Sequence, residues 1–268
     1  MAIPTKTSDN NLMSDQLTKP IPTDDEVLVG LNRRFKMLAE MTHGVARGAF
    51  HGLIIQGEKG LGKSHTVHAI LDEYDPTVEG NEEMPEEQRR SIKRFTGKIT
   101  PMQLYLALQE YSGKKCILLF DDCDSAWNDI GALNILKAAM DTKPRRTVTW
   151  ASSARAIREQ SFVFEGSVIV ITNAHMHSGH YKAFLDRVHK FRVTMTAREK
   201  LLKIQEIATV APEYDRNLAS QVFEHIQENQ QYIGPRLSMR TFVKTYELVT
   251  FSENWRELAM ETVYAEEQ

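Results

Sequence analysis

Short apolar runs that end in polar residues recur along the chain, and they predict buried strands. Residues 53–56 read Leu-Ile-Ile-Gln, and residues 116–122 read Cys-Ile-Leu-Leu-Phe-Asp-Asp. A third run, over 168–173, reads Val-Ile-Val-Ile-Thr-Asn. Runs this short and this apolar are typical of strands inside a parallel sheet, where both faces are covered. We therefore expect an α/β fold with an open parallel sheet.

Apolar residues at helical spacing fill much of the remaining sequence. Asp24 or Asp25 is expected to cap the first helix. Proline at position 101 suits the first turn of another. Helices are predicted over 24–42, 65–74 and 132–140 and from Pro101 onward.

The composition of successive segments divides the chain into three parts. Residues 1–23 are rich in Thr, Ser, Asp, Asn and Pro and predict a mobile tail. Residues 24–195 hold the strands and helices of an α/β core. Thr196 and Glu199 have the spacing of a capping box, so a new helix is expected to start there. Three or four helices would then form a small all-α lid over 196–268.

Residues 57–64 read Gly-Glu-Lys-Gly-Leu-Gly-Lys-Ser, a complete G-x-x-x-x-G-K-S motif between a predicted strand and a predicted helix. Glycines allow the backbone to turn tightly and to aim several N–H groups at a phosphate. Lys63 adds positive charge for the β and γ phosphates, and the Ser64 hydroxyl can bind Mg²⁺. The sequence thus predicts an ATP site formed by Gly57, Glu58, Lys59, Gly60, Leu61, Gly62, Lys63, Ser64 and His65.

Carboxylates and an amide follow two of the predicted strands. Asp121 and Asp122 end the second apolar run, and Asn173 follows the third. In an open α/β sheet the ligand lies beyond the carboxyl ends of the strands. We expect Asp121 to act with Ser64 on Mg²⁺, Asp122 to lie beside the γ-phosphate, and Asn173 to orient the attacking water.

These motifs, in this order, resemble the AAA+ ATPases over about residues 24–250. The resemblance implies a P-loop NTPase sheet flanked by helices, with ATP held between core and lid. It implies that Asp122 is the catalytic base and that Asn173 is the residue called sensor 1. It also implies that the connection over 44–52 lies beside adenine.

The resemblance assigns two arginines to ATP hydrolysis. Arg187 resembles the arginine finger that reaches a neighbouring subunit's ATP, although Arg192 lies close by. Arg240 resembles the lid residue called sensor 2, with Arg236 as a competitor. A shared site of this kind implies a homo-oligomer, in a ring or a helical assembly.

The chain departs from the family pattern at Asp122, where most members have Glu. Asp is one methylene shorter, so slow hydrolysis, or a switch that mainly binds ATP, is also consistent with the sequence. Residues 121–127 also resemble the viral superfamily-III helicases, but those lack a long helical lid.

The compact core-plus-lid layout is similar to replication-type ATPases of phages and bacteria, such as helicase loaders. This resemblance implies an ATPase that remodels or loads a DNA replication complex, with DNA and a protein client such as a helicase as partners. Two alternatives are kept: a chaperone-like protein remodeller and an ATP-switched scaffold. DNA-stimulated hydrolysis would separate the first function from the second.

Two basic segments are candidate nucleic-acid contacts. Residues 143–158 carry Trp150 among the cations Lys143, Arg145, Arg146, Arg155 and Arg158. Residues 145–150 and 161–164 are expected to be the two arms of a hairpin. Cations with an aromatic suit a phosphate backbone and stacked bases, but a purely structural hairpin explains the segment equally well. Lys98 lies in a loop, 96–99, that faces the pore in AAA+ rings; a simple loop is the alternative.

Composition bears on the cellular compartment and on the partners expected for the protein. The 268 residues carry a formal net charge of −3, which does not suggest a protein coated with nucleic acid. Cys116 and Cys123 do not form a disulfide framework and suit a reducing compartment. The sequence shows no apolar run near the length of a membrane span and no apolar signal region, so we expect a cytoplasmic protein without a membrane partner. The histidines at 175, 177 and 180 lack a nearby acid or Cys, which disfavours a zinc site there.

Overall fold

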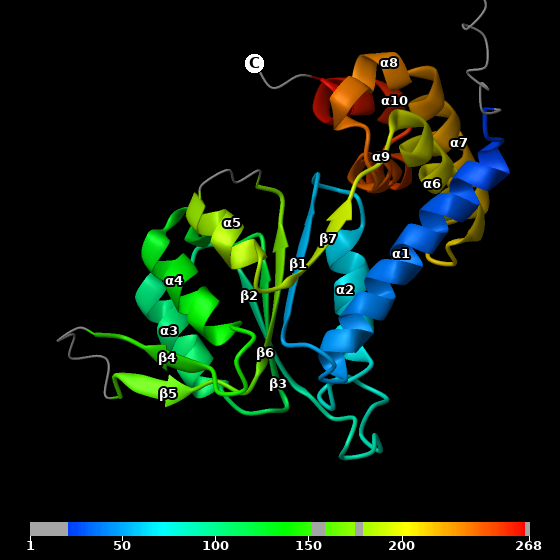
Figure 1. The fold of residues 1–268 in the computed structure, drawn as a ribbon. Helices are drawn as coiled ribbons and strands as arrows, with labels where there is room; N and C mark the ends of the chain where they lie inside the picture. The colour runs from blue at the N-terminus through cyan, green and yellow to red at the C-terminus, as the bar shows by residue number, and fades with distance from the viewer. Residues whose placement is uncertain (1–20, 152–158, 175–178, 266–268) are drawn as a thin grey trace, which may run out of the picture.

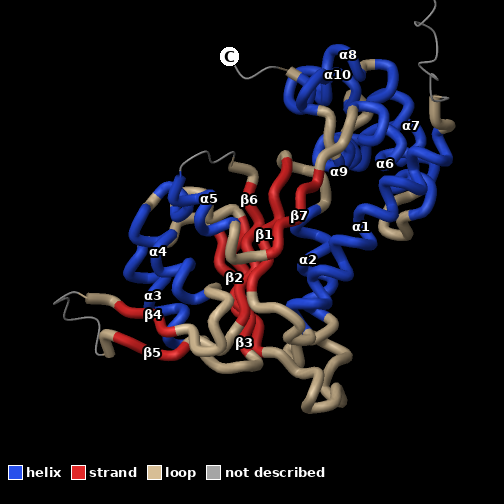
Figure 2. The backbone as a smooth tube through the Cα atoms, in the orientation of Figure 1, coloured by secondary structure: helices blue, strands red, loops and turns tan. Residues whose placement is uncertain are grey.

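The computed structural model describes residues 21–151, 159–174 and 179–265. At the centre of this described part lies a five-stranded sheet with the order β2-β3-β6-β1-β7, and every neighbouring pair is parallel (Figures 1 and 2). Its strands are β1 (Gly52–Gly57), β2 (Ser91–Thr96), β3 (Cys116–Asp121), β6 (Ser167–Thr172) and β7 (His189–Val193). The three predicted strands are the three inner ones, which explains why their sequences are apolar without alternation.

Helices cover both faces of the sheet (Figure 1). Leu118 and Phe120 of β3 pack on the side that holds α3 (Pro101–Glu110), α4 (Ile130–Ala139) and α5 (Gly179–Leu185). Ile117 and Leu119 of the same strand face the other side, where α1 (Asp24–Ala46) and α2 (Lys63–Asp72) lie. This alternation follows from the two-residue period of a strand.

Local capping fixes where the helices begin. Thr23, and not Asp24 or Asp25, caps α1, because its side chain accepts the Glu26 N–H while Glu26 accepts the Thr23 N–H. Thr100 caps α3, with Pro101 in its first turn as expected. Asp129 caps α4, which starts two residues earlier than the predicted 132.

A short antiparallel hairpin connects α4 to β6. Its strands are β4 (Thr147–Thr149) and β5 (Ser161–Val163). Trp150 does not extend outward for base stacking; it packs against the apolar cluster around α3, with its ring centroid 5.7 Å from that of Tyr105. The structural interpretation of the hairpin therefore holds for Trp150.

The C-terminal residues form a helical region with its own apolar cluster, which includes Ile204, Val222 and Phe242. It begins at the predicted capping box, where Thr196 and Glu199 exchange hydrogen bonds. More helices are present than the three or four expected, because two short ones join the longer ones: α6 (Ala197–Val210), α7 (Arg216–Glu228), α8 (Gln230–Ile233), α9 (Met239–Phe251) and α10 (Trp255–Ala259). The 3₁₀ turns Ala126–Asn128 and Gly234–Arg236 and a π-helical turn, Met260–Tyr264, complete the elements.

Helix α1 contacts both parts of the molecule (Figure 1). Its C-terminal half packs beside α2, and buried Val45 and Ala46 extend it beyond the predicted end at 42. Nearer its start, the Asn32 amide donates to Glu206 of α6 at 2.6 Å, and Arg34 forms an ion pair with Glu199. Within the described residues, no helix is both long and apolar enough to cross a membrane.

Candidate nucleotide-binding site

The loop between β1 and α2 has the backbone of a phosphate cradle. Gly60 and Gly62 lie at φ +73° and +84°, in the left-handed region that favours glycine. A Cβ on Gly57 would come 2.1 Å from the carbonyl oxygen of Val193. Helix α2 starts at Lys63, two residues earlier than predicted, so its first-turn N–H groups belong to the motif itself. The loop suits a bound phosphate group.

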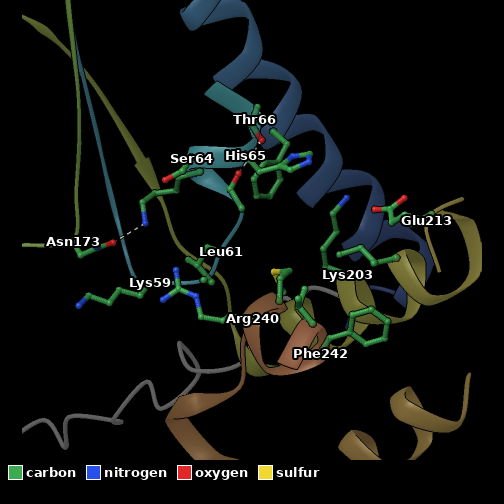
Figure 3. Close-up of a pocket in the computed structure, with 18 of the residues that line it drawn as sticks. Lys59, Leu61, Ser64, His65, Thr66, Asn173, Lys203, Glu213, Arg240 and Phe242 are labelled. Carbon is green, nitrogen blue, oxygen red and sulfur yellow. Dashed lines mark hydrogen bonds between the residues drawn. The ribbon is translucent and has the colours of Figure 1, made fainter. Parts of the chain in front are cut away.

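Lys63 connects this loop to the end of β6. Its ammonium donates to the carbonyl oxygens of Gly57 at 2.8 Å and Glu58 at 2.5 Å. It also donates to Oδ1 of Asn173 at 2.9 Å (Figure 3). Burial lowers the pKa of Lys63, and the nearby carboxylates, Asp122 foremost, oppose that shift. The side chain is therefore a buried cation whose charge is balanced by acids at the strand ends.

Ser64 and Asp121 lie together. The Ser64 hydroxyl donates to Oδ1 of Asp121 at 3.1 Å. Nε2 of His68, one turn further along α2, lies 3.4 Å from the other carboxylate oxygen. A hydroxyl and a carboxylate side by side are the oxygen ligands that Mg²⁺ favours, so these residues fit the expected ion. Sequence reasoning missed His68; the helical period places it one turn after Ser64, on the side of α2 that meets Asp121.

Asp122 and Asn173 form a direct hydrogen bond at the tips of adjacent strands. The Asn173 amide donates to Oδ1 of Asp122 at 2.6 Å. Among the described residues, Asp122 is the one non-glycine residue with positive φ, +54°. Such backbone conformations cluster at functional sites, where the surrounding structure holds them. At Asp122, this conformation accompanies a carboxylate that lies on the wall of the cavity described below.

The next two residues support this strand end and are not themselves reactive. Asp124 accepts a hydrogen bond from the Thr172 hydroxyl at 2.5 Å. Cys123 is buried, and this burial, with the acids on either side, raises its thiol pKa to about 11. The thiol therefore stays protonated, and we assign it to packing.

A cavity of about 610 Å³ lies between the loop and the C-terminal helices (Figure 3). The N–H of Met239, at the start of α9, donates to the Gly60 carbonyl at 3.0 Å. Lys200 of α6 forms an ion pair with Glu58 at 2.7 Å. The C-terminal region thus contacts the phosphate loop directly and closes one side of the cavity.

Most of the predicted site residues reach this cavity. Its wall includes Lys59, Gly60, Leu61, Gly62, Lys63, Ser64, His65, Asp122, Asn173 and Arg240. Gly57, Glu58 and Asp121 lie behind it and support Lys63, Lys200 and Ser64. Arg236 is not on the wall; it donates to the Tyr232 carbonyl at 2.7 Å. Of the two lid candidates, Arg240 is the one that faces the cavity.

Arg187 does not line the cavity of its own chain. It is exposed in the turn between α5 and β7, where its N–H donates to the Phe184 carbonyl at 3.1 Å. Of the predicted catalytic residues, Asp122 and Asn173 are on the cavity wall and Arg187 is not.

The far wall of the cavity was not expected from the sequence. It is built from Phe35 of α1, Lys203 and Ile207 of α6, and Glu213 and Tyr214 of the following loop. Phe35 carried only the signal of an amphipathic helix. The connection over 44–52, expected beside adenine, does not contribute to this wall, because α1 carries it to the opposite edge of the sheet. The place of adenine beside this connection stays a prediction.

The basic segment also differs from its prediction. Arg146 is 4% exposed and donates to the Ala139 carbonyl at 2.9 Å, so it does not project into solvent. Lys143 and Arg145 are exposed. Arg155, Arg158 and the histidines at 175 and 177 lie outside the described residues, as does the side chain of His180. Lys98 is exposed in its loop, and its pore role stays a prediction.

Comparison with known proteins gives one curated relative and a distant structural likeness. No family model matches the chain. An uncharacterized 36.7 kDa protein from the nrdC-mobD intergenic region of Enterobacteria phage T4 is 31% identical over 153 residues, which are 56% of this chain and 44% of that protein. The chain thus aligns with less than half of this relative. A solved DNA replication initiation factor matches 87% of this chain and 64% of its own, at 12% identity and a TM-score of 0.45. A likeness this distant identifies neither a function nor a shared site.

Proposed function

We propose that this protein is an Mg²⁺-dependent ATPase of the AAA+ type that acts as a homo-oligomer on a DNA replication complex. One observation carries the ATPase part. Lys63, Asp122 and Asn173 are joined by direct hydrogen bonds at the ends of adjacent strands, beside a cavity of about 610 Å³. A phosphate loop, a carboxylate and a polar amide at one strand edge form the arrangement that phosphoryl transfer to water requires.

Each residue would have a distinct task. Lys63 and the loop N–H groups would bind the phosphates, and Ser64 and Asp121 would hold Mg²⁺. Bound Mg²⁺ would offset the negative charge on the phosphate oxygens. Asp122 would accept a proton from the attacking water while Asn173 keeps that carboxylate in place.

The C-terminal helical region would change its contacts with the phosphate loop when nucleotide binds. We assign residues 24–195 to the core, 196–268 to a lid, and 1–23 to a tail. Arg240 faces the cavity, while Lys200 and Met239 contact the phosphate loop. The negative charge of a nucleotide bound at the loop would therefore act on these three residues of the proposed lid.

The oligomer is part of the proposal because Arg187 is exposed and is not on the wall of its own cavity. An arginine finger supplied by a neighbouring subunit can contribute about 10³–10⁵ in rate. The DNA-linked role rests on the resemblance of the compact core-plus-lid layout to replication-type ATPases.

The first test is ATP turnover at several protein concentrations, with and without single-stranded DNA. We expect turnover per subunit to rise with concentration and with DNA. Lys63→Ala should abolish binding of a fluorescent ATP analogue, whereas Lys59→Ala, an exposed cation on the same loop, should weaken it much less. Unchanged binding by Lys63→Ala would refute the nucleotide site. ATP hydrolysis without any response to DNA would favour the protein remodeller.

The 2.6 Å bond between Asn173 and Asp122 supports a second candidate, an ATP-switched scaffold with slow turnover. While that bond is in place, it holds one carboxylate oxygen that a base would need. Tight ATP binding with turnover unchanged by DNA and by concentration would favour the switch over the ATPase.

A further inference from the structure

A second cavity lies at the edge of the sheet opposite the phosphate loop. Its volume, about 570 Å³, is close to that of the nucleotide cavity. Its wall includes His51 just before β1, Arg90 just before β2, Lys115 just before β3 and Ser167 at the start of β6. The amino ends of four parallel strands therefore surround it, near the C-terminal end of α1 (Figure 1).

Three arginines line this cavity, and none of them forms an ion pair with a carboxylate in the described part of the chain. Arg47 donates from Nε to the Tyr74 hydroxyl at 3.1 Å. Arg90 donates only to backbone carbonyls, among them that of Ala46 at 2.5 Å. Arg146 likewise donates to a carbonyl, that of Ala139. Each guanidinium keeps further N–H groups for another acceptor, because it carries five donors.

Arg146 is the most informative of the three. Its side chain is buried, with the guanidinium 5.2 Å from the centroid of the Phe164 ring. Burial lowers the pKa of this guanidinium, and Glu165 acts in the opposite direction. A buried cation without a paired anion is costly. Binding of an anion at the cavity wall would recover that cost.

The carboxylates on the wall offset this charge only in part, although Glu165 acts on Arg146 through space. Glu165 pairs with Lys114 at 3.6 Å, and Asp141 pairs with Lys143 at 3.8 Å. These pairs leave Glu87 as the remaining wall carboxylate opposite the three arginines. Together with burial, Arg146 also lowers the pKa of the neighbouring His51, as a positive field would.

We propose that this cavity binds a phosphate-bearing ligand. Planar guanidinium groups pair with phosphate oxygens in a bidentate manner, and that is the chemistry three unpaired arginines offer. A smaller neighbouring cavity of about 500 Å³ shares Arg47, Glu87 and Arg90 with it, which provides room for adjacent phosphates. The phosphate source is a free polyphosphate or the backbone of a nucleic acid. The site is independent of the proposed ATPase, since it shares no wall residue with the nucleotide cavity.

The test uses the full chain with Lys63→Ala, so that the phosphate loop does not dominate binding. Inorganic pyrophosphate and a single-stranded oligonucleotide are titrated by calorimetry at low salt. We expect pyrophosphate to bind. Arg47→Gln and Arg146→Gln should each weaken it about tenfold, as expected for loss of one charged hydrogen bond. Arg89→Gln, an arginine beside the site but not on either wall, is the matched control and should bind as the parent does. The NMR signals of His51 should move on binding.

Competition between the oligonucleotide and pyrophosphate would identify the nucleic-acid backbone as the source, and pyrophosphate binding alone would identify a free polyphosphate. Arg47 is exposed, so Arg47→Gln is expected to fold. It therefore tests the site even if Arg146→Gln does not fold. The proposal is overturned if neither probe binds, or if Arg89→Gln weakens binding as much as Arg47→Gln does.

Discussion

The backbone at Asp122 gives a physical reason for the residue found there. Its φ of +54° lies in the left-handed region, which costs most residues about 1–2 kcal/mol. Asp and Asn visit this region more readily because their short side chains bond locally. A separate, long-range contact also holds the side chain: the Asn173 amide donates to the carboxylate of Asp122. The glutamate expected from the AAA+ pattern lacks this tolerance, so Asp suits both the backbone and the proposed base.

This argument predicts that Asp122→Asn keeps the fold and nucleotide binding but loses turnover. Asn also tolerates the left-handed region and preserves the shape, whereas it cannot accept the proton of water. Loss of general-base catalysis typically costs about 10²–10⁴ in rate. The measurements are ATP turnover and affinity for a fluorescent ATP analogue, with circular dichroism as the folding control. Turnover at the parental rate would show that Asp122 is not the base.

At the scale of elements, the phosphate loop and helix α9 meet at Gly60. A Cβ added to Gly60 would lie 2.8 Å from Oγ of Ser238, the residue that caps α9. The N–H of Met239 donates to the carbonyl of this same glycine. The contact therefore depends on the absence of a side chain at one position of the loop.

Gly60→Ala should weaken nucleotide binding by moving α9 away from the loop. Gly80→Ala is a matched control, because Gly80 also has positive φ, +90°, but a Cβ there would meet nothing within 4 Å. Both variants should lose about 1 kcal/mol of unfolding free energy from backbone strain. Only Gly60→Ala should also lose affinity for an ATP analogue, by about tenfold if one contact of about 1.4 kcal/mol is lost. Equal affinities of the two variants would show that the α9 contact does not act on the site.

The sequence predicted elements whose signals are local. The three inner strands, the phosphate loop and the capping box at Thr196 were predicted from contiguous residues, and the structure has each of them. Phe35 and Glu213 were missed as cavity residues, because they lie more than a hundred residues apart and only the packing of α1 beside α6 brings them to one wall. The environment of Arg146 was also predicted wrongly. A run of basic residues does not indicate which of them points inward, because that depends on tertiary packing.

At the scale of the whole molecule, the nucleotide cavity joins three separate parts. Its wall combines the strand ends, the middle of α1 and the C-terminal helices. Helix α1 contacts both α2 and α6, so any movement of the C-terminal helices relative to the sheet must act on α1 as well. Binding at this cavity is therefore expected to affect the molecule beyond the phosphate loop. Arg187 is not on this wall, so the role proposed for it requires a neighbouring subunit.

The last prediction concerns this shared site. Arg187→Ala should bind the ATP analogue normally yet hydrolyse ATP poorly, by about 10³-fold or more if the residue acts as an arginine finger. Mixing it with Asp122→Asn should restore part of the activity, because some interfaces then pair an intact Asp122 with an intact Arg187. Arg192→Ala, the neighbouring exposed arginine on β7, is the matched control and should retain turnover. Rescue requires that the interfaces work independently, so the rise of turnover with protein concentration is measured beside it. Concentration-independent turnover by a monomer, with Arg187→Ala as active as the parent, would exclude a site completed by a second subunit.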